Sequence, residues 1–262
     1  MQDFVKIIKI WQYRQLLYFL TIKEIKVRYK QAFFGIAWAI LTPLSQALVF
    51  AFIFGILLKT QINNIPYLLL VFSGFTFWNF FALSISSATS ALTGNTNLVT
   101  KSTFPKEILV LASVFGRLPD LLASLTMLLI MLAFYQINFS MQLLWIIPMF
   151  AIEVILALGI GLFFAAANVY FRDITALVPL LLMLWLYLTP VVYSLSLIPK
   201  AYQFFISLNP MTGILEGVRG SLFLQKSPDI SALILLMCIS LTIFIINFIL
   251  FKKLEKGFAD II

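Results

Sequence analysis

Six long stretches of the sequence carry no charged residue. They cover residues 31–58, 60–100, 121–152, 154–171, 174–199 and 230–251. Most are long enough for the roughly 20 apolar residues that a helix needs to cross about 30 Å of hydrocarbon. The chain is 62% hydrophobic and 11% charged, its mean hydropathy is +1.05, and no stretch alternates in the way of barrel strands. The sequence therefore predicts an all-α integral membrane protein.

The runs place six membrane spans, at 34–58, 67–90, 108–134, 143–168, 174–193 and 230–251. Six spans put both termini on one side, which then carries 13 of the 18 Lys and Arg residues, against four on the other side and Arg117 within the third span. Because Lys and Arg accumulate in cytoplasmic loops, we expect both termini in the cytoplasm. The net charge of +8 then reflects topology and not binding to nucleic acid.

Residues 1–30 contain too many charges to span a membrane. Large apolar residues nevertheless recur there at helical spacing, namely Phe4, Ile8, Trp11, Tyr18, Ile22 and Ile25. This pattern predicts an amphipathic helix that lies in the cytoplasmic interface, with its basic face on anionic lipid head groups. A solvated basic tail is the alternative, and the many large apolar residues argue against it.

The connection at 194–229 is long, lies on the external side of the expected topology and is still apolar. Pro199 and the pair Asn209–Pro210 break it into short segments. We expect two short helices that re-enter the outer leaflet, which requires that their backbone is buried in protein or faces water.

The connection at 92–107 joins the second and third spans on the cytoplasmic side. Asn95 or Thr96 is suited to cap a short helix that ends before Phe104, because the residue preceding a proline avoids helical geometry. Such a helix, carrying Lys101, would be a docking element for a partner. A plain interhelical loop is equally compatible with these residues.

Three ionisable side chains fall at membrane depth. A charge at the bilayer centre costs about 2.5–3.5 kcal/mol on insertion scales, so each should face protein or water. Arg117 and Asp120 are three residues apart and are expected to pair on one helical face. Glu153 has no partner in its own span, so pairing across helices with Arg117 and a position near the outer interface both stay open. A proton relay through Glu153 is the less favoured interpretation.

Aromatic residues make up 16% of the chain. Most suit contact with lipid or the belts at the two membrane interfaces. Sugars, however, also bind by laying their apolar C–H faces on aromatic rings, so a Trp- and Tyr-lined path would suit a glycan. Composition alone does not choose between these roles.

Several chemistries are excluded by missing residues. The sequence has no His and a single Cys, Cys238, so zinc–histidine sites, Ser-His-Asp or Cys-His catalysis and an internal disulfide are absent, and no metal site is expected. A phosphate-binding loop of the form G-x-x-x-x-G-K-[ST] is also missing, so the chain is not itself a P-loop ATPase. The amphipathic start gives no reason to expect a cleavable signal peptide.

Five blocks follow one another over nearly the whole chain. They are VRYKQAFFGIAWAILTPL (27–44), GNTNLVTKSTFPKEI (94–108), NVYFRDI (168–174), YLTPVVYSLSLIP (187–199) and NPMTGILEGVRGSL (209–222). Together they resemble the membrane subunit of type-2 ABC exporters of polysaccharide, the family of O-antigen and teichoic-acid permeases. The resemblance implies a single transmembrane domain over 1–262 that is not an enzyme and binds no cofactor.

The resemblance also implies partners and a location. The chain would form a homodimer that assembles with two copies of a separate nucleotide-binding subunit, which holds ATP and magnesium. It would lie among the lipids of the bacterial inner (plasma) membrane and move a glycan linked to polyprenyl pyrophosphate. Teichoic acid, capsule and small hydrophobic or drug substrates would suit the same topology. A membrane enzyme would need a cluster of acidic or His residues at an interface, and an ion channel or secondary transporter would need more polar groups at the midplane.

Functional positions follow from the resemblance by motif. The substrate path would include Arg28, Tyr29, Lys30, Phe33, Phe34, Trp38, Tyr187 and Tyr193. Phe77, Trp78 and Trp185 lie outside the five blocks and are added to this path because aromatic rings suit contact with sugars. Coupling to the ATPase would involve Asn95, Asn97, Leu98, Lys101, Phe104 and Pro105. The external gate would include Pro199, Asn209, Pro210, Glu216 and Arg219.

Overall fold

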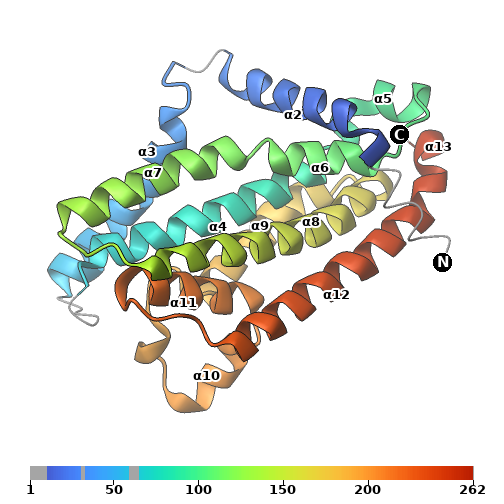
Figure 1. The fold of residues 1–262 in the computed structure, drawn as a ribbon. Coiled ribbons are helices and arrows are strands. Elements are labelled where there is room, and N and C mark those ends of the chain that lie inside the picture. Colours follow the sequence, from blue (N-terminus) through green and yellow to red (C-terminus); the bar gives the residue numbers. More distant parts are fainter. Residues whose placement is uncertain (1–10, 31–32, 59–64, 262) are drawn as a thin grey trace.

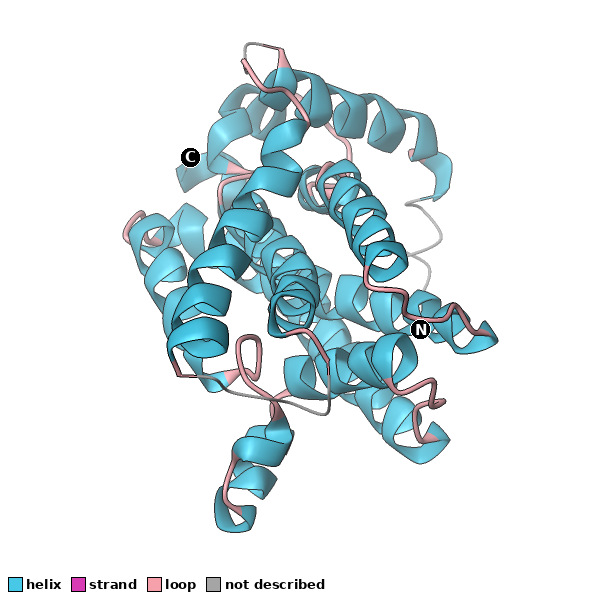
Figure 2. Cartoon of the chain, turned by 90° about the vertical axis from the view of Figure 1, so that its left-hand side faces the viewer, coloured by secondary structure: helices cyan, strands magenta, loops and turns pink. Residues whose placement is uncertain are grey.

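The computed structural model describes residues 11–30, 33–58 and 65–261. Helices form all of the regular elements in these ranges, and short loops connect them without any intervening strand element (Figure 2). The expectation of an all-α protein is therefore confirmed. Phe4 and Ile8 of the expected amphipathic helix lie outside the described ranges. So do Lys6, Lys9 and Lys59, three of the cations that were counted for the expected topology.

Five helical segments within the described ranges are long and apolar enough to cross a membrane. They are α3 (Ala37–Phe50) continued by the π-helical η1 (Ala51–Leu57), α4 (Tyr67–Thr89), α6 (Glu107–Phe115) with α7 (Leu118–Phe134), η3 (Met141–Trp145) with α8 (Ile146–Tyr170), and α12 (Ile230–Leu254) with η5 (Glu255–Gly257). Each of the five agrees with an expected span to within a few residues, so the chain is a multi-pass membrane protein.

The remaining helices are shorter and connect or flank these segments. They are α2 (Arg14–Tyr29), η2 (Thr93–Asn95), α5 (Thr96–Lys101), α9 (Ile174–Leu188), η4 (Leu195–Leu197), α10 (Lys200–Ser207), α11 (Pro210–Phe223) and α13 (Phe258–Ile261). The N-terminal amphipathic helix is thus present over Arg14–Tyr29, and it packs on α6. The connection at 92–107 contains the short α-helix α5 after the 3₁₀ turn η2, and the connection at 194–229 contains the α-helices α10 and α11 after the 3₁₀ turn η4.

The expected span at 174–193 is shorter than predicted. Its helix, α9, has 15 residues, which at 1.5 Å per residue reach only about 22 Å. Thr189 is extended, with φ −105° and ψ 137°, because a residue that precedes a proline, here Pro190, avoids helical geometry. The prediction of six full spans is therefore not confirmed, since α9 is too short to cross the membrane by itself.

The expected span at 108–134 is broken into two helices. The helix α6 ends at Phe115, and α7 begins at Leu118 with Pro119 in its first turn. Proline is favoured in the first turn of a helix and disfavoured in the interior. The break places Arg117 at the N-cap of α7 and Asp120 in its first turn, where a carboxylate is favoured by the helix dipole.

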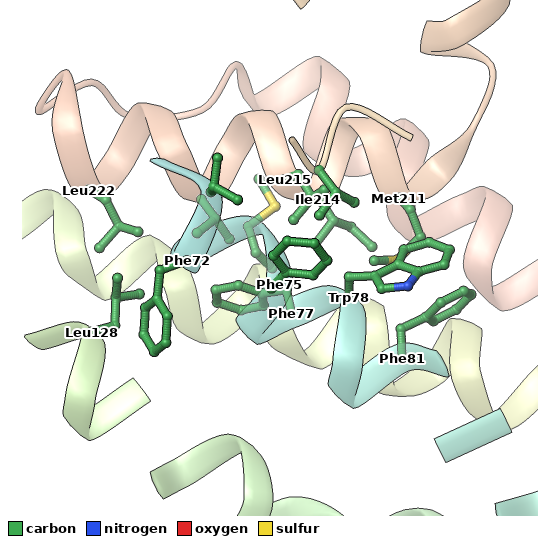
Figure 3. Packing of buried hydrophobic residues seen from close by; sticks show 14 of the residues in the cluster. Phe72, Phe75, Phe77, Trp78, Phe81, Leu128, Met211, Ile214, Leu215 and Leu222 are labelled. Carbon is green, nitrogen blue, oxygen red and sulfur yellow. The ribbon is translucent and has the colours of Figure 1, made fainter. Parts of the chain in front are cut away.

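The helix α4 is the centre of the bundle. It contacts α3, α6, α7, α8, α9 and α11, and most of its side chains are buried. Figure 3 shows Phe75 and Trp78 of α4 close to Ile214 and Met211 of α11, and Phe72 beside Leu128 of α7. This dense packing of aromatic rings fixes the position of α4 against its neighbours.

Small residues on α8 allow two other helices to approach closely. A Cβ atom built on Gly159 would lie 2.8 Å from the Cα atom of Phe244 on α12, and one on Gly161 would lie 2.7 Å from the Cβ atom of Ala88 on α4. Such contacts between small residues and a neighbouring backbone are typical of helix packing in membranes. Figure 1 shows α12 lying along α8 for most of its length.

The connecting helices gather at two ends of the molecule. The helices α5 and α13 contact each other at one end, and α10 and α11 lie at the opposite end (Figure 1). The two ends are described below as the α5 end and the α11 end.

Candidate functional site

A cleft of about 160 Å³ brings the block VRYK…GIAW together with the α6–α7 break. It is lined by the end of α2, the start of α3, the middle of α4 and the start of α7. Arg28, Tyr29 and Trp38 from the predicted substrate path lie there beside Arg117 and Asp120. We call this region the arginine cleft.

Asp120 accepts contacts from three side chains in the arginine cleft. Its Oδ2 atom lies 3.1 Å from Nη1 of Arg28 and 3.3 Å from Nη1 of Arg117. Its Oδ1 atom accepts a hydrogen bond from the hydroxyl of Tyr29. The predicted pair of Arg117 with Asp120 is therefore confirmed, and Arg28 is a second cation on the same carboxylate that sequence spacing did not suggest.

The two arginines are anchored by further contacts. Nη1 of Arg28 also donates to the carbonyl oxygen of Gly116 at 2.8 Å. Nε and Nη2 of Arg117 donate to Oγ of Ser87 at 2.9 and 2.7 Å. Nε and Nη2 of Arg28 make no hydrogen bond with any residue in the described ranges. Arg28 thus keeps donors that an added ligand would use.

Exposed aromatic rings adjoin the arginine cleft. Trp38 lines it and is 52% exposed. The ring centroid of Phe34 lies 5.5 Å from that of Trp38, and the ring of Phe33 lies 5.0 Å from that of Phe34. Lys30 is exposed nearby in sequence but does not line the cleft. Cationic and aromatic groups therefore occur together here.

The other predicted path aromatics lie elsewhere. Phe77 and Trp78 are buried in the core, where the Trp78 ring contacts that of Trp185 at 6.5 Å. The rings of Phe77 and Trp78 offer no surface to a sugar, because neighbouring helices cover them. Tyr187 is exposed, and the hydroxyl of Tyr193 donates to its carbonyl oxygen at 3.0 Å. The sequence pattern did not distinguish these core rings from exposed ones.

The predicted coupling residues form a short helix with one exposed face. Asn97 and Lys101 on α5 are exposed, Leu98 is half-buried, and Phe104 is buried beyond the helix end. Asn95 occupies the N-cap position of α5, but its side chain does not cap the helix. Its Oδ1 atom instead accepts a 2.7 Å hydrogen bond from Nζ of Lys23 on α2.

Polar contacts from Asn168 hold the end of α4 and the turn η2, which precede α5. Nδ2 of Asn168, at the end of α8, donates to the carbonyl oxygen of Thr89 at 3.0 Å and to Oγ1 of Thr93 at 3.1 Å. Oγ1 of Thr175 donates to Oδ1 of Asn168 at 2.7 Å. The block NVYFRDI thereby connects the α8–α9 turn to the connection that carries α5.

A buried ion-pair network follows the connection at 92–107. Glu107 is buried, and its Oε2 atom lies 2.6 Å from Nζ of Lys252 on α12. Lys252 also pairs with Glu255 at 2.8 Å, and Oε1 of Glu255 accepts the backbone N–H of Lys106 at 2.9 Å. Burial lowers the pKa of the Lys106 ammonium, and the nearby Glu255 carboxylate opposes that shift. Sequence reasoning missed this network because Glu107 and Lys252 lie 145 residues apart.

Arg219 on α11 organises the α11 end. Its Nη1 atom donates to the carbonyl oxygens of Pro190 at 2.5 Å and Tyr193 at 3.1 Å. Its Nη2 atom donates to those of Val191 at 2.6 Å and Leu70 at 3.4 Å. We call this arrangement the carbonyl cage. It joins α11, the turn after α9 and the start of α4.

The other predicted gate residues lie around the carbonyl cage. Asn209 caps α11 by accepting the backbone N–H of Met211 at 3.1 Å, and its Nδ2 atom donates to Oγ1 of Thr189 at 2.8 Å. Pro210 is the first residue of α11, and Glu216 lies 3.8 Å from Arg219. Pro199 is the N-cap of α10.

Glu153 has no partner in the described ranges. It is fully buried on α8, and both carboxyl oxygens are without a hydrogen bond. The expected alternative of an ion pair with Arg117 is wrong, because Arg117 contacts Ser87 and Asp120 instead. The alternative of a position near the outer interface does not explain the complete burial.

Comparison of the sequence with known proteins identifies the family to which the chain is similar. Residues 15–223 match the family described as ABC-2 type transporter. The chain is 32% identical over 248 residues to an O-antigen export system permease protein RfbA of Klebsiella pneumoniae, covering 94% of this chain and 95% of the relative. It is 30% identical over 258 residues to the protein of that name from Myxococcus xanthus, covering 96% and 97%. The Polysialic acid transport protein KpsM of Escherichia coli is 24% identical over 204 residues, covering 76% and 78%.

Proposed function

The chain belongs to the ABC-2 type transporter family, and we propose that it is the membrane subunit of an ATP-driven polysaccharide exporter. Its substrate would be an O-antigen-like glycan linked to polyprenyl pyrophosphate, taken from the cytoplasmic leaflet of the bacterial inner membrane. The observation that carries the proposal is the similarity to O-antigen export permeases over nearly the whole chain.

The exporter would contain two copies of this chain and two copies of a separate ATPase subunit. The sequence has no phosphate-binding loop of its own, so hydrolysis of ATP belongs to the partner. The exposed face of α5, with Asn97 and Lys101, would dock on that partner. The α5 end and both termini would then lie in the cytoplasm.

The arginine cleft would receive the pyrophosphate of the substrate. Arginine is suited to this role because its planar guanidinium group offers several donors to phosphate oxygens. Arg28 keeps donors without a partner among the described residues, and Lys30 is exposed close by in the chain. Trp38, Phe34 and Phe33 would offer rings to the first sugars beside the pyrophosphate.

The glycan would leave at the α11 end, between the two copies of the chain. The segment from α9 to α11 would form the external gate, with Arg219 and Asn209 keeping its turns in place. Tyr187 is exposed on α9 and would contact sugar rings, whereas the buried Phe77 and Trp78 support the core behind the path.

A capsule-type polysaccharide is the second candidate substrate. It is favoured by the similarity to Polysialic acid transport protein KpsM. That similarity is lower in identity and covers less of the chain than the match to the O-antigen permeases, which is why an O-antigen-like substrate is preferred.

Co-purification of the full-length chain from its native membranes, followed by mass spectrometry, tests the proposal. We expect a P-loop ATPase at one-to-one stoichiometry and a polyprenyl-diphosphate glycan. A matched preparation from cells in which glycan synthesis is blocked should keep the ATPase and lose the lipid-linked sugar. Absence of both the ATPase and the glycan, in a detergent that preserves oligomers, would contradict the proposal.

A further inference from the structure

Asp120 occupies the position in the arginine cleft where an anion would bind. Both of its carboxylate oxygens are engaged, one by Arg28 and Arg117 and the other by Tyr29. It is the only acidic residue among those that line the cleft in the described part of the chain. Two guanidinium groups against one carboxylate leave a net positive charge.

The carboxylate uses the two arginines incompletely. Each guanidinium group offers Asp120 only its Nη1 atom, at 3.1 and 3.3 Å, whereas the strongest arginine–carboxylate pairs are bidentate. The two arginine side chains remain 22% and 19% exposed. Asp120 therefore holds the arginines in place without saturating their donors.

From this geometry we propose that Asp120 is an internal counter-anion that a substrate phosphate displaces, so that its carboxylate lowers the affinity of the cleft for phosphate ligands. The inference rests on the proposed function, in which the arginine cleft receives the pyrophosphate. A phosphate oxygen that approaches Nη1 of Arg28 or Arg117 competes with Oδ2 of Asp120 for the same donors.

The expected effect follows from the charges that compete. The carboxylate repels any phosphate that approaches the two guanidinium groups, and it repels a diphosphate at least as strongly as a monophosphate, because the diphosphate carries more negative charge. A diphosphate has more acceptor oxygens, so it can engage both guanidinium groups at once and offset more of this repulsion. Removing the charge of Asp120 should therefore raise the affinity for both ligands.

The test compares two soluble probes on the purified full-length chain, farnesyl diphosphate and farnesyl monophosphate, by native mass spectrometry. The wild-type chain should prefer the diphosphate. Asp120→Asn keeps the shape of the side chain and removes the competing charge, so the affinity for the monophosphate should rise by about tenfold, which corresponds to about 1.4 kcal/mol. The affinity for the diphosphate should rise at least as much, because the repulsion that is removed is no smaller for the more negative ligand.

Two further variants separate competition from a loss of structure. The double variant Arg117→Gln/Asp120→Asn removes one charge of each sign and should bind the monophosphate at least as tightly as the wild type. Asp173→Asn changes an exposed acid that does not line the cleft and should change neither affinity. If both Asp120 variants melt at the wild-type temperature and show no gain in monophosphate affinity, Asp120 is only a clamp and the inference is overturned.

Arg28→Gln distinguishes this inference from the proposed function. If Arg28→Gln weakens diphosphate binding while Asp120→Asn brings no gain for the monophosphate, the inference alone is wrong. If the wild-type chain binds neither probe, or Arg28→Gln binds both as tightly as the wild type, the proposed role of the cleft is wrong and the inference falls with it.

Discussion

Arg28 and Arg219 carry the same side chain but are held in different ways. Arg219 lies in the carbonyl cage, is 6% exposed and gives both of its terminal nitrogens to backbone carbonyl oxygens. Arg28 shares the carboxylate of Asp120 with Arg117 at the wall of the arginine cleft, and some of its N–H donors have no partner among the described residues. A buried cation whose terminal nitrogens serve the backbone stabilises the fold, whereas a half-buried cation with free donors is available to a ligand.

Replacing Arg219 should produce the largest loss of stability. Arg219→Leu removes the guanidinium donor from the carbonyl oxygens of Pro190, Val191 and Tyr193, whereas that of Leu70 keeps the hydroxyl of Ser73. Breaking such a buried polar arrangement costs about 3–5 kcal/mol. We expect the free energy of unfolding, measured by titration with a denaturing detergent, to fall by that amount. Arg28→Leu is the matched control and should cost about 1 kcal/mol or less, because Asp120 keeps Arg117 and Tyr29 as partners. Equal losses in the free energy of unfolding of the two variants would mean that Arg28 and Arg219 stabilise the fold to the same extent.

The packing around the carbonyl cage gives a second, smaller prediction. A Cβ atom on Gly74 would lie 2.4 Å from the carbonyl oxygen of Val191 and 2.9 Å from Nη2 of Arg219. Gly74→Ala should therefore lower the free energy of unfolding by about 1–3 kcal/mol, the usual cost of overpacking. Gly94→Ala meets nothing within 4 Å and should cause no loss. Unchanged stability of Gly74→Ala would show that the turn after α9 moves freely.

A change of charge at the α5 end should impair function without affecting folding. Lys101 is exposed and makes no ion pair within the described ranges, so Lys101→Glu should leave the thermal midpoint unchanged. Under the proposed function it should reduce co-purification with the ATPase subunit and the stimulated ATPase rate several-fold. Lys226→Glu, exposed at the α11 end, should reduce neither. A normal ATPase rate in Lys101→Glu would count against the docking role of α5.

Trp38 should give the smallest effect. Trp38→Ala removes a half-exposed ring from the wall of the arginine cleft, so export should slow a few-fold with little change in stability. Phe52→Ala removes a similarly exposed ring from the same span outside the cleft and should leave export unchanged. Export rates measured in cells with equal amounts of each variant provide the test, and an unchanged rate for Trp38→Ala would mark that ring as lipid-facing.

Local signals in the sequence were sufficient for most of the helices. The charge-free runs located α4, α8 and α12 to within a few residues because a membrane-spanning helix must keep its polar backbone bonded and its side chains apolar over a set length. Asn209–Pro210 and Pro199 correctly indicated where two short helices begin. The same signals misjudged the end of α9, because Pro190 keeps Thr189 out of helical geometry and ends the helix at Leu188.

The candidate site was only partly predictable. The pair Arg117–Asp120 followed from a separation of three residues, but Arg28 and Tyr29 lie 92 and 91 residues from Asp120, and no local pattern connects them. Aromatic content likewise did not separate the core rings of α4 from the exposed Trp38, since both kinds of position in a membrane protein favour large apolar side chains.

The sequence by itself determined the helical class, the approximate spans and the positions of the short helices, because these depend on residues that are neighbours along the chain. Only the tertiary structure decided that Arg219 is enclosed by carbonyl groups, that Glu107 meets Lys252 and that Arg28 and Arg117 share Asp120. Buried charges need partners within a few ångströms, and which groups come within that distance depends on how the helices pack against one another.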